Sequence, residues 1–221
     1  MIELNEIRPY GYGVFLYSPD VLTDFLKEKT CRAKKLLTYF DKNKNVFFES
    51  IKNGVALPIY RISVYSYPIF VFMNETYETI PQGWEQVYRY NDFFIQVGNS
   101  SKLCFAAFDY FEYHKDLIDK HQTDYSKEIP TGPDEILTTD HYAVGFDIPK
   151  GCYSFDLIGY KRSILLDESK RENYGRNYAY GVVFKPTNKK ENTNLDKCDD
   201  EKHIFDIGHY LHDAQGGAYQ G

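Results

Sequence analysis

Residues 142–157 read YAVGFDIPKGCYSFDL and contain the clearest strand pattern in the chain. Apolar residues alternate with small or polar ones from Tyr142 to Ile148, and the alternation resumes from Tyr153 to Leu157. A period of two is typical of a strand with one buried face, and the Pro149-Lys-Gly151 segment has the composition of a tight turn. The stretch therefore predicts a β-hairpin.

A second hairpin is predicted upstream of the first. Phe93–Val97 and Leu103–Phe108 are two apolar runs separated by the turn residues 98–101. The later run is apolar at nearly every position, which is typical of a strand covered on both faces, so we expect it in the middle of a sheet. Further short strands are expected within 62–73 and 180–185, with prolines at their ends or on an edge.

The amino-terminal part carries the helical signals. Ser18-Pro19-Asp20 has the composition of a helix start, with Ser18 able to cap free N–H groups and Pro19 at the first helical position. Apolar residues then recur at helical spacing as far as Phe40. One or two helices are predicted over residues 19–40, and the polar run 41–45 is expected to end them.

Composition also favours β structure. The chain has 21 Tyr and 16 Phe, which supply most of its 17% aromatic residues, and both types favour strands. We therefore predict a mainly β, β-sandwich-like fold with an amino-terminal helical segment, α+β overall. Two related halves are one option: residues 1–115, a connecting segment 116–140, and residues 141–221 with a mobile loop at 187–202 and a carboxy-terminal tail. The alternative is a single domain, 1–221.

The charge balance restricts the partners. The net charge is -6, with 26 Lys and Arg against 32 Asp and Glu, whereas a nucleic-acid ligand requires a basic surface. We therefore expect a basic protein partner and no nucleic acid. The basic residues between Lys27 and Lys44 fit a solvated helix face, with an anion or RNA contact as the alternative.

Cysteine usage and the chain start favour the cytoplasm. The four scattered cysteines form no C-x-x-C pair, so free thiols in a reducing compartment are expected. The first residues, MIELNE, lack the basic and apolar regions of a secretory signal, and no run of about 18 apolar residues predicts a membrane-spanning helix. A cytoplasmic protein without a membrane association is the expectation.

Motifs that carry chemistry are weak. His209, His212 and Asp213, with His203 nearby, could bring two imidazoles and a carboxylate to one metal ion, which leaves a metal-dependent hydrolase as an alternative. No nucleophile elbow or phosphate-binding loop accompanies them. The prediction is a non-enzymatic protein with no cofactor and no bound metal.

Tyrosines and carboxylates supply the candidate binding surface. The tyrosines exceed what a core of this size is expected to absorb with every hydroxyl paired, so some should be exposed, and exposed Tyr suits protein interfaces. A glycan-binding module that uses Trp84 is a second alternative. The predicted partner-binding residues are Asp109, Glu112, Asp134, Glu135, Asp199, Asp200, Glu201, Tyr110 and Tyr113.

Two segments resemble the strand–turn–strand units of small bacterial immunity proteins, which neutralise a cognate toxin. They are FDIPKGCYSF at 146–155 and GVALPI at 54–59, and the resemblance covers about residues 46–185. It implies an inhibitor that occludes the active site of a toxin. It implies nothing about individual toxin-facing residues, because such proteins diverge together with their partners. The negative net charge would steer the inhibitor toward a basic cleft.

Overall fold

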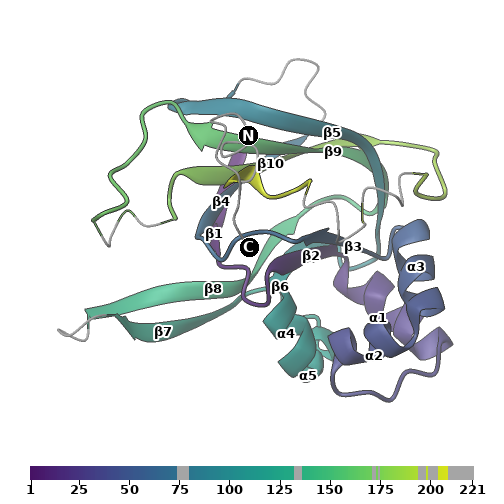
Figure 1. The fold of residues 1–221 in the computed structure, drawn as a ribbon. Helices are drawn as coiled ribbons and strands as arrows, with labels where there is room; N and C mark the ends of the chain where they lie inside the picture. Colours follow the sequence, from purple (N-terminus) through teal and green to yellow (C-terminus); the bar gives the residue numbers. More distant parts are fainter. Residues whose placement is uncertain are drawn as a thin grey trace.

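The computed structural model describes residues 1–73, 80–131, 136–170, 173, 175–193, 198 and 204–208. It contains ten strands and five helices, and the five helices lie between residues 19 and 119 (Figure 1). The elements are β1 (Ile2–Ile7), β2 (Gly13–Tyr17), α1 (Pro19–Glu28), α2 (Leu36–Lys42), α3 (Lys44–Lys52), β3 (Ala56–Tyr60), β4 (Tyr67–Met73), β5 (Trp84–Val97), β6 (Lys102–Ala107), α4 (Phe108–Tyr113), α5 (Lys115–Asp119), β7 (Tyr125–Thr131), β8 (Ile136–Asp147), β9 (Gly151–Arg162) and β10 (Tyr178–Pro186).

All ten strands belong to one sheet with the order β3-β2-β6-β8-β1-β4-β10-β9-β5, and β7 pairs with β8 beside this path. The sheet bends back on itself, so that β5, β9 and β10 lie opposite β2 and β6 (Figure 1). Side chains from both parts meet in one core, where for example the rings of Phe146 and Phe184 lie 5.8 Å apart. The predicted class, mainly β with a few helices, is confirmed.

The two ends of the sheet nearly close on each other. The Gln96 N–H on β5 donates to the Gly54 carbonyl before β3 at 2.8 Å. Asn192, 4% exposed, bridges the same gap: Nδ2 donates to the Ile51 and Phe94 carbonyls at 2.6 and 2.8 Å, and Oδ1 accepts from the Phe94 N–H at 2.5 Å. The segment after β10 thus joins α3 to β5.

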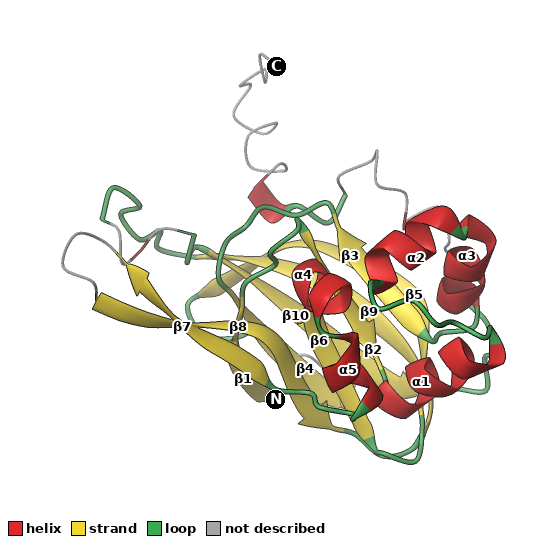
Figure 2. Cartoon of the chain, turned by 90° about the horizontal axis from the view of Figure 1, so that it is seen from below, coloured by secondary structure: helices red, strands yellow, loops and turns green. Residues whose placement is uncertain are grey.

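The helices cover the outer face of β2 and β6 (Figure 2). Strand β6 is apolar on both faces because Leu103 and Phe105 point into the sheet core while Cys104 and Ala106 point toward the helices. The prediction that this strand lies in the middle of a sheet is confirmed, since β6 pairs with β2 and β8.

Both predicted hairpins are wrong. Strand β5 pairs with β9 rather than with β6, and β8 pairs with β6, β7 and β1 rather than with β9. The turns 98–101 and 148–150 instead carry the chain between the two parts of the bent sheet. They lie together, because Ile148 N–H donates to the Ser101 carbonyl at 3.0 Å and Lys150 Nζ donates to Asn99 Oδ1 at 2.7 Å.

Other sequence predictions hold in part. Helices α1 and α2 occupy the predicted range 19–40, but the polar run 41–45 does not end the helical region: it lies at the end of α2 and the start of α3, and only Asn43 separates these helices. Ser18 precedes α1 without a side-chain capping bond to the helix. The connecting segment 116–140 contains most of α5, β7 and the start of β8.

Strands of the two predicted halves alternate within the sheet. Strand β8 lies between β6 and β1, and β10 lies between β4 and β9, so the strands of both predicted halves share one sheet. Within the predicted mobile loop 187–202, Asn192 and Cys198 are buried and the Cys198 carbonyl accepts the Tyr60 hydroxyl at 2.9 Å. The tail 209–221 lies outside the described residues. Among the described helices, none has the length and apolar character needed to cross a bilayer.

Asn192→Ala should lower the free energy of unfolding by about 2–4 kcal/mol, because it leaves buried groups of Ile51 and Phe94 without their partners. Urea denaturation of the purified variant measures this loss. Asn99→Ala, at an exposed turn, is the matched control and should change stability by less than about 0.5 kcal/mol. Equal effects of the two substitutions would contradict the closing role of Asn192.

Asp20 ties the start of α1 to the 98–101 turn and makes stability depend on pH. Burial raises the Asp20 pKa, but hydrogen bonds from Ser100 N, Ser100 Oγ and Ser18 Oγ at 2.8–2.9 Å outweigh it, so the pKa falls to about 2. A lowered pKa adds stability above the unfolded value near 4, and this stability is lost as the pH falls toward 2.

Asp20→Asn should therefore lower the free energy of unfolding by about 1 kcal/mol at pH 7, after allowance for solvent screening. The difference from wild type should shrink between pH 4 and pH 2 in denaturant titrations. A difference that stays constant over this range would show that Asp20 acts only as a neutral hydrogen-bond acceptor.

Candidate functional site

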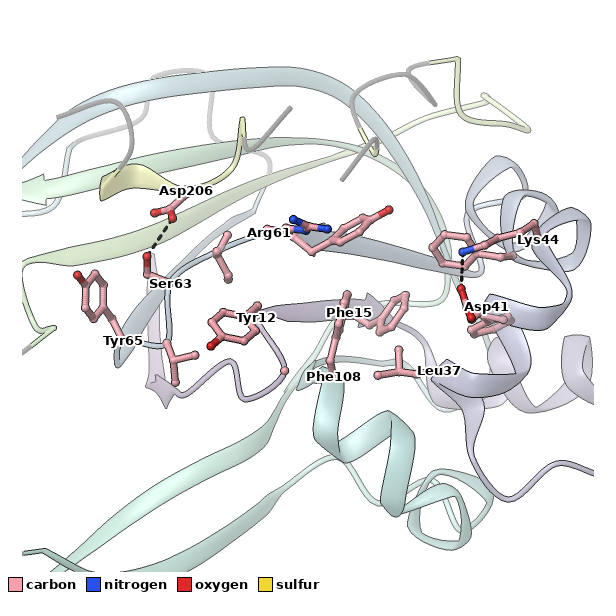
Figure 3. A pocket seen from close by; sticks show the side chains of 16 residues that line it. Tyr12, Phe15, Leu37, Asp41, Lys44, Arg61, Ser63, Tyr65, Phe108 and Asp206 are labelled. Atoms are coloured by element: carbon pink, nitrogen blue, oxygen red, sulfur yellow. Dashed lines mark hydrogen bonds and ion pairs between the residues drawn. The ribbon is translucent and has the colours of Figure 1, made fainter. Parts of the chain in front are cut away.

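A pocket with a volume of about 860 Å³ lies between the helices and the loops above β2 (Figure 3). Helices α2 and α3 form one wall, and the loop between β3 and β4 forms the other. The loop between β1 and β2 contributes Gly11 and Tyr12, the start of α4 contributes Phe108, and the turn 204–208 contributes Asp206. Five segments far apart in the sequence thus build one site.

Aromatic rings form the floor of this pocket, which we call the aromatic pocket. Phe15 on β2 is central: its ring stacks on Phe108 with 4.8 Å between centroids and lies 6.3 and 6.4 Å from Phe40 and Phe47. The Tyr60 ring lies 5.6 Å from Phe108. Phe15 and Phe40 are 1% and 2% exposed and form the base of this aromatic layer. The half-buried rings of Phe47, Tyr60 and Phe108 supply the apolar surface that a ligand can reach.

The strand period and one glycine place these rings. Val14 and Leu16 of β2 point into the sheet core, so Phe15 points outward, under the helices. The Phe108 ring packs directly on Gly13, where an added Cβ would lie 2.7 Å from Phe108 Cζ. Any side chain at position 13 would push Phe108 off the floor.

Charged and polar groups occupy the rim. At one end, Lys44 Nζ lies 2.7 Å from Asp41 Oδ1 in an exposed ion pair, and this contact lowers the Asp41 pKa. At the other end, Ser63 Oγ donates to Asp206 Oδ2 at 2.9 Å. The exposed Arg61 side chain lies between the two ends (Figure 3).

This arrangement suits binding of an apolar group. Ligand sites are typically concave, about 300–1,000 Å³ in volume and mainly apolar, with a few polar groups that orient the ligand. The aromatic pocket meets each criterion: rings supply contact area, and the rim supplies two carboxylates and two cations.

The predicted partner-binding residues on α4 have different roles. Tyr110 is fully buried and donates its hydroxyl to the Gln122 carbonyl at 2.9 Å, so it cannot contact a partner directly and that assignment is wrong. Tyr113 is 61% exposed, and Asp109 is half-buried, one turn earlier on the same helix.

Glu112 holds α2 in place. It accepts hydrogen bonds from the Thr38 N–H at 3.1 Å and the Thr38 hydroxyl at 2.7 Å, and it pairs with Lys35 at 3.2 Å. Burial raises the Glu112 pKa, but the bonds from Thr38 and Lys35 outweigh it, so the pKa lies below its usual range. Glu112 therefore holds α2 in place, and these contacts within the chain account for its position without a role in binding a partner.

The remaining predicted site residues lie outside the described residues. They are Asp134, Glu135, Asp199, Asp200 and Glu201, together with His203, His209, His212 and Asp213 of the predicted metal cluster. Within the described ranges, no three His, Cys, Asp or Glu side chains are grouped to hold a metal ion. All four cysteines are free thiols.

Trp84 is nearly buried. It is 9% exposed, packs edge-on against Phe70 and is covered by the Arg162 guanidinium at 4.7 Å from the ring centroid. The glycan-binding alternative relied on an accessible indole, and Trp84 does not provide one.

The sequence patterns do not predict the aromatic pocket. Lys44 was assigned to a solvated helix face, and Phe15 carried no signal beyond that of an apolar strand. The tight Gly11-Tyr-Gly13 loop, with positive φ at Gly11 and Tyr12, was the one local hint that the chain makes a close approach here.

Comparisons with known proteins add no information about the site. No family model, no curated protein and no solved structure matches the chain.

Proposed function

We propose that this protein is a non-enzymatic binding protein whose aromatic pocket receives an apolar segment of a protein partner. The observation that carries the proposal is the set of half-buried aromatic rings, Phe47, Tyr60 and Phe108, which line the pocket around the buried Phe15 and lie within a charged rim. Aromatic residues and Arg dominate the energetics of protein interfaces, and both are present at this site.

The distribution of charge supports a peptide segment as the occupant. Asp41 pairs with Lys44, and Asp206 accepts from Ser63, so these rim groups already have partners on this chain. Burial of apolar side chains over the rings is then the main source of affinity, at about 25 cal/mol per Å². The carboxylates of Asp41 and Asp206 have further lone pairs, which can accept hydrogen bonds from the peptide N–H groups and so orient the peptide.

Filling the pocket should weaken binding. Leu37→Trp places a larger side chain at the pocket wall and should weaken binding of apolar peptides by about tenfold or more. The peptides are selected from a random displayed library against the full chain, and their affinity is measured by fluorescence anisotropy.

Leu117→Trp is the matched control. Leu117 on α5 is also half-buried against the same helical core but does not line the pocket. Binding that survives in Leu37→Trp as well as in Leu117→Trp would remove the support for the aromatic pocket as the binding site.

An immunity-type inhibitor is the second candidate function. The observation that favours it is the pair Asp109 and Tyr113 on one face of α4, where a carboxylate and an exposed ring can meet a basic surface. Such an inhibitor would act in the cytoplasm on a toxin with a basic cleft, and the net charge of -6 would speed their encounter.

Asp109→Asn combined with Tyr113→Ala should slow association with the toxin, about threefold to tenfold at low salt and less at high salt. The probe is the product of the neighbouring gene, expressed with and without this protein to follow cell survival and then used in stopped-flow binding. Asp24→Asn, an exposed carboxylate on α1, is the control. Absence of both protection and complex formation would refute this candidate.

A further inference from the structure

The two ends of the aromatic pocket differ in charge. At one end, Lys44 Nζ neutralises the Asp41 carboxylate at 2.7 Å. At the other end, Asp206 accepts hydrogen bonds from the Ser63 hydroxyl at 2.9 Å and from the Gly208 N–H at 3.0 Å, and both donors are neutral. Within the part of the chain that the structure describes, Asp206 has no ion pair. The negative charge at this end is therefore not balanced.

Asp206 is held in position before any ligand binds. Its turn is fixed because the neighbouring Phe205 carbonyl accepts the hydroxyls of Tyr88 and Tyr180 at 2.6 and 2.8 Å. Each carboxylate oxygen of Asp206 accepts one bond from this chain, whereas a carboxylate can accept about four, so further sites remain. A carboxylate that is already oriented loses little conformational entropy when it binds a cation.

Two tyrosine rings lie at the same end of the pocket. Tyr12 and Tyr65 line the pocket beside Ser63 and Asp206 (Figure 3). The Tyr65 ring stacks on Tyr178 with 5.5 Å between ring centroids, which fixes its orientation. Tyr12 is 64% exposed. Because the face of an aromatic ring attracts cations, tyrosines beside an unbalanced carboxylate favour a cationic ligand group.

The backbone of Tyr12 is strained. Its φ of 64° lies in the left-handed region, which is unfavourable for an aromatic residue. Hydrogen bonds impose this conformation: the Tyr12 N–H donates to the Pro9 carbonyl, and the Ile62 N–H donates to the Tyr12 carbonyl, both at 3.0 Å. The exposed ring adds little to the core, so its burial does not offset the strain. Strained residues of this kind occur preferentially at ligand-binding sites, which favours a ligand contact as the role of the Tyr12 ring.

We infer that the Asp206 end of the aromatic pocket binds a lysine or arginine side chain of the partner segment, beside the apolar side chains that the rings receive. This inference rests on the proposed function. The cationic group donates to Asp206, while its aliphatic stem packs against Tyr12 and Tyr65. Lys44 lies at the opposite end and Arg61 lies between the two ends, so the position that favours a cation is the one beside Asp206 (Figure 3).

A basic segment of another protein is favoured over a second copy of this chain. Each copy carries a net charge of -6, so two copies repel each other, whereas a segment with a basic residue is attracted. An acidic or uncharged segment would cover the Asp206 carboxylate without supplying an opposite charge, which is unfavourable.

Peptide selection tests the inference. Peptides are selected from a random displayed library against the full chain, and their sequences show whether Lys or Arg recurs at one position beside apolar residues. One selected peptide, and the same peptide with its basic residue replaced by Gln, are then measured by fluorescence anisotropy. The proteins compared are wild type, Asp206→Asn, Tyr12→Asn and Asp41→Asn. Asp206→Asn removes the charge but keeps an oxygen that can accept from Ser63, and Asp41→Asn removes the carboxylate at the other end as the matched control.

Asp206→Asn should weaken binding of the basic peptide by about tenfold at low salt and by less at high salt, and binding of the Gln peptide by less than about twofold. Asp41→Asn should change either affinity by less than about threefold. Tyr12→Asn should weaken binding of the basic peptide by about threefold to tenfold without lowering the unfolding temperature, because Asn tolerates the left-handed conformation better.

The possible failures are distinguishable. Selected peptides without a recurring basic residue, equal losses for the two peptides in Asp206→Asn, or normal binding by Tyr12→Asn would overturn the inference, and the proposed function stands if Leu37→Trp still weakens binding. Selection of no peptide, or normal binding by Leu37→Trp, would overturn both. Self-association of wild type in sedimentation equilibrium that Asp206→Asn abolishes would also overturn the inference, because a second copy would then be the occupant.

Discussion

Closure of one strongly bent sheet is the constraint on which the rest of the structure depends. Its two ends, at β3 and β5, meet through the Gln96–Gly54 hydrogen bond and through Asn192, which uses both atoms of its amide. Gly54 is required at this seam, because an added Cβ would lie 2.6 Å from the Phe94 ring. The seam fixes α3 against the sheet, and α3 in turn provides one wall of the aromatic pocket.

Strand β2 transmits this constraint to the candidate site. Successive side chains of a strand point to opposite faces, so Leu16 fills the core while Phe15 and Tyr17 support the helices. The floor of the pocket is consequently the outer surface of the sheet, covered at one side by α2 and α3 and left open between these helices and the Tyr60–Tyr65 segment. A binding surface built on a strand keeps its geometry better than one built on loops alone.

Periodicity predicted strand content and burial but not strand pairing. Leu103–Ala107 alternates between two apolar environments, which is why the sequence placed it correctly in the middle of a sheet. The turns 98–101 and 148–150 have the composition of hairpin turns, yet each joins a strand in one part of the bent sheet to a strand in the other part. Strands on both sides of such a connection show the same alternation of apolar residues as the strands of a hairpin, so the alternation does not distinguish the two. The pocket was beyond prediction because its residues come from five segments that only the topology brings together.

The expectation that the core cannot absorb all the tyrosines is met only in part. Tyr12 and Tyr113 are exposed as expected, but the core absorbs far more tyrosine than its size suggested. The reason is a pairing that sequence cannot show: several buried hydroxyls donate to main-chain carbonyls of turns and connecting segments, although the buried Tyr17 hydroxyl has no such partner among the described residues. Tyr88 and Tyr180 both donate to the Phe205 carbonyl, at 2.6 and 2.8 Å. These two bonds hold the turn 204–208 against the core and thereby place Asp206 at the rim of the candidate site, so buried tyrosines, and not only exposed ones, shape that site.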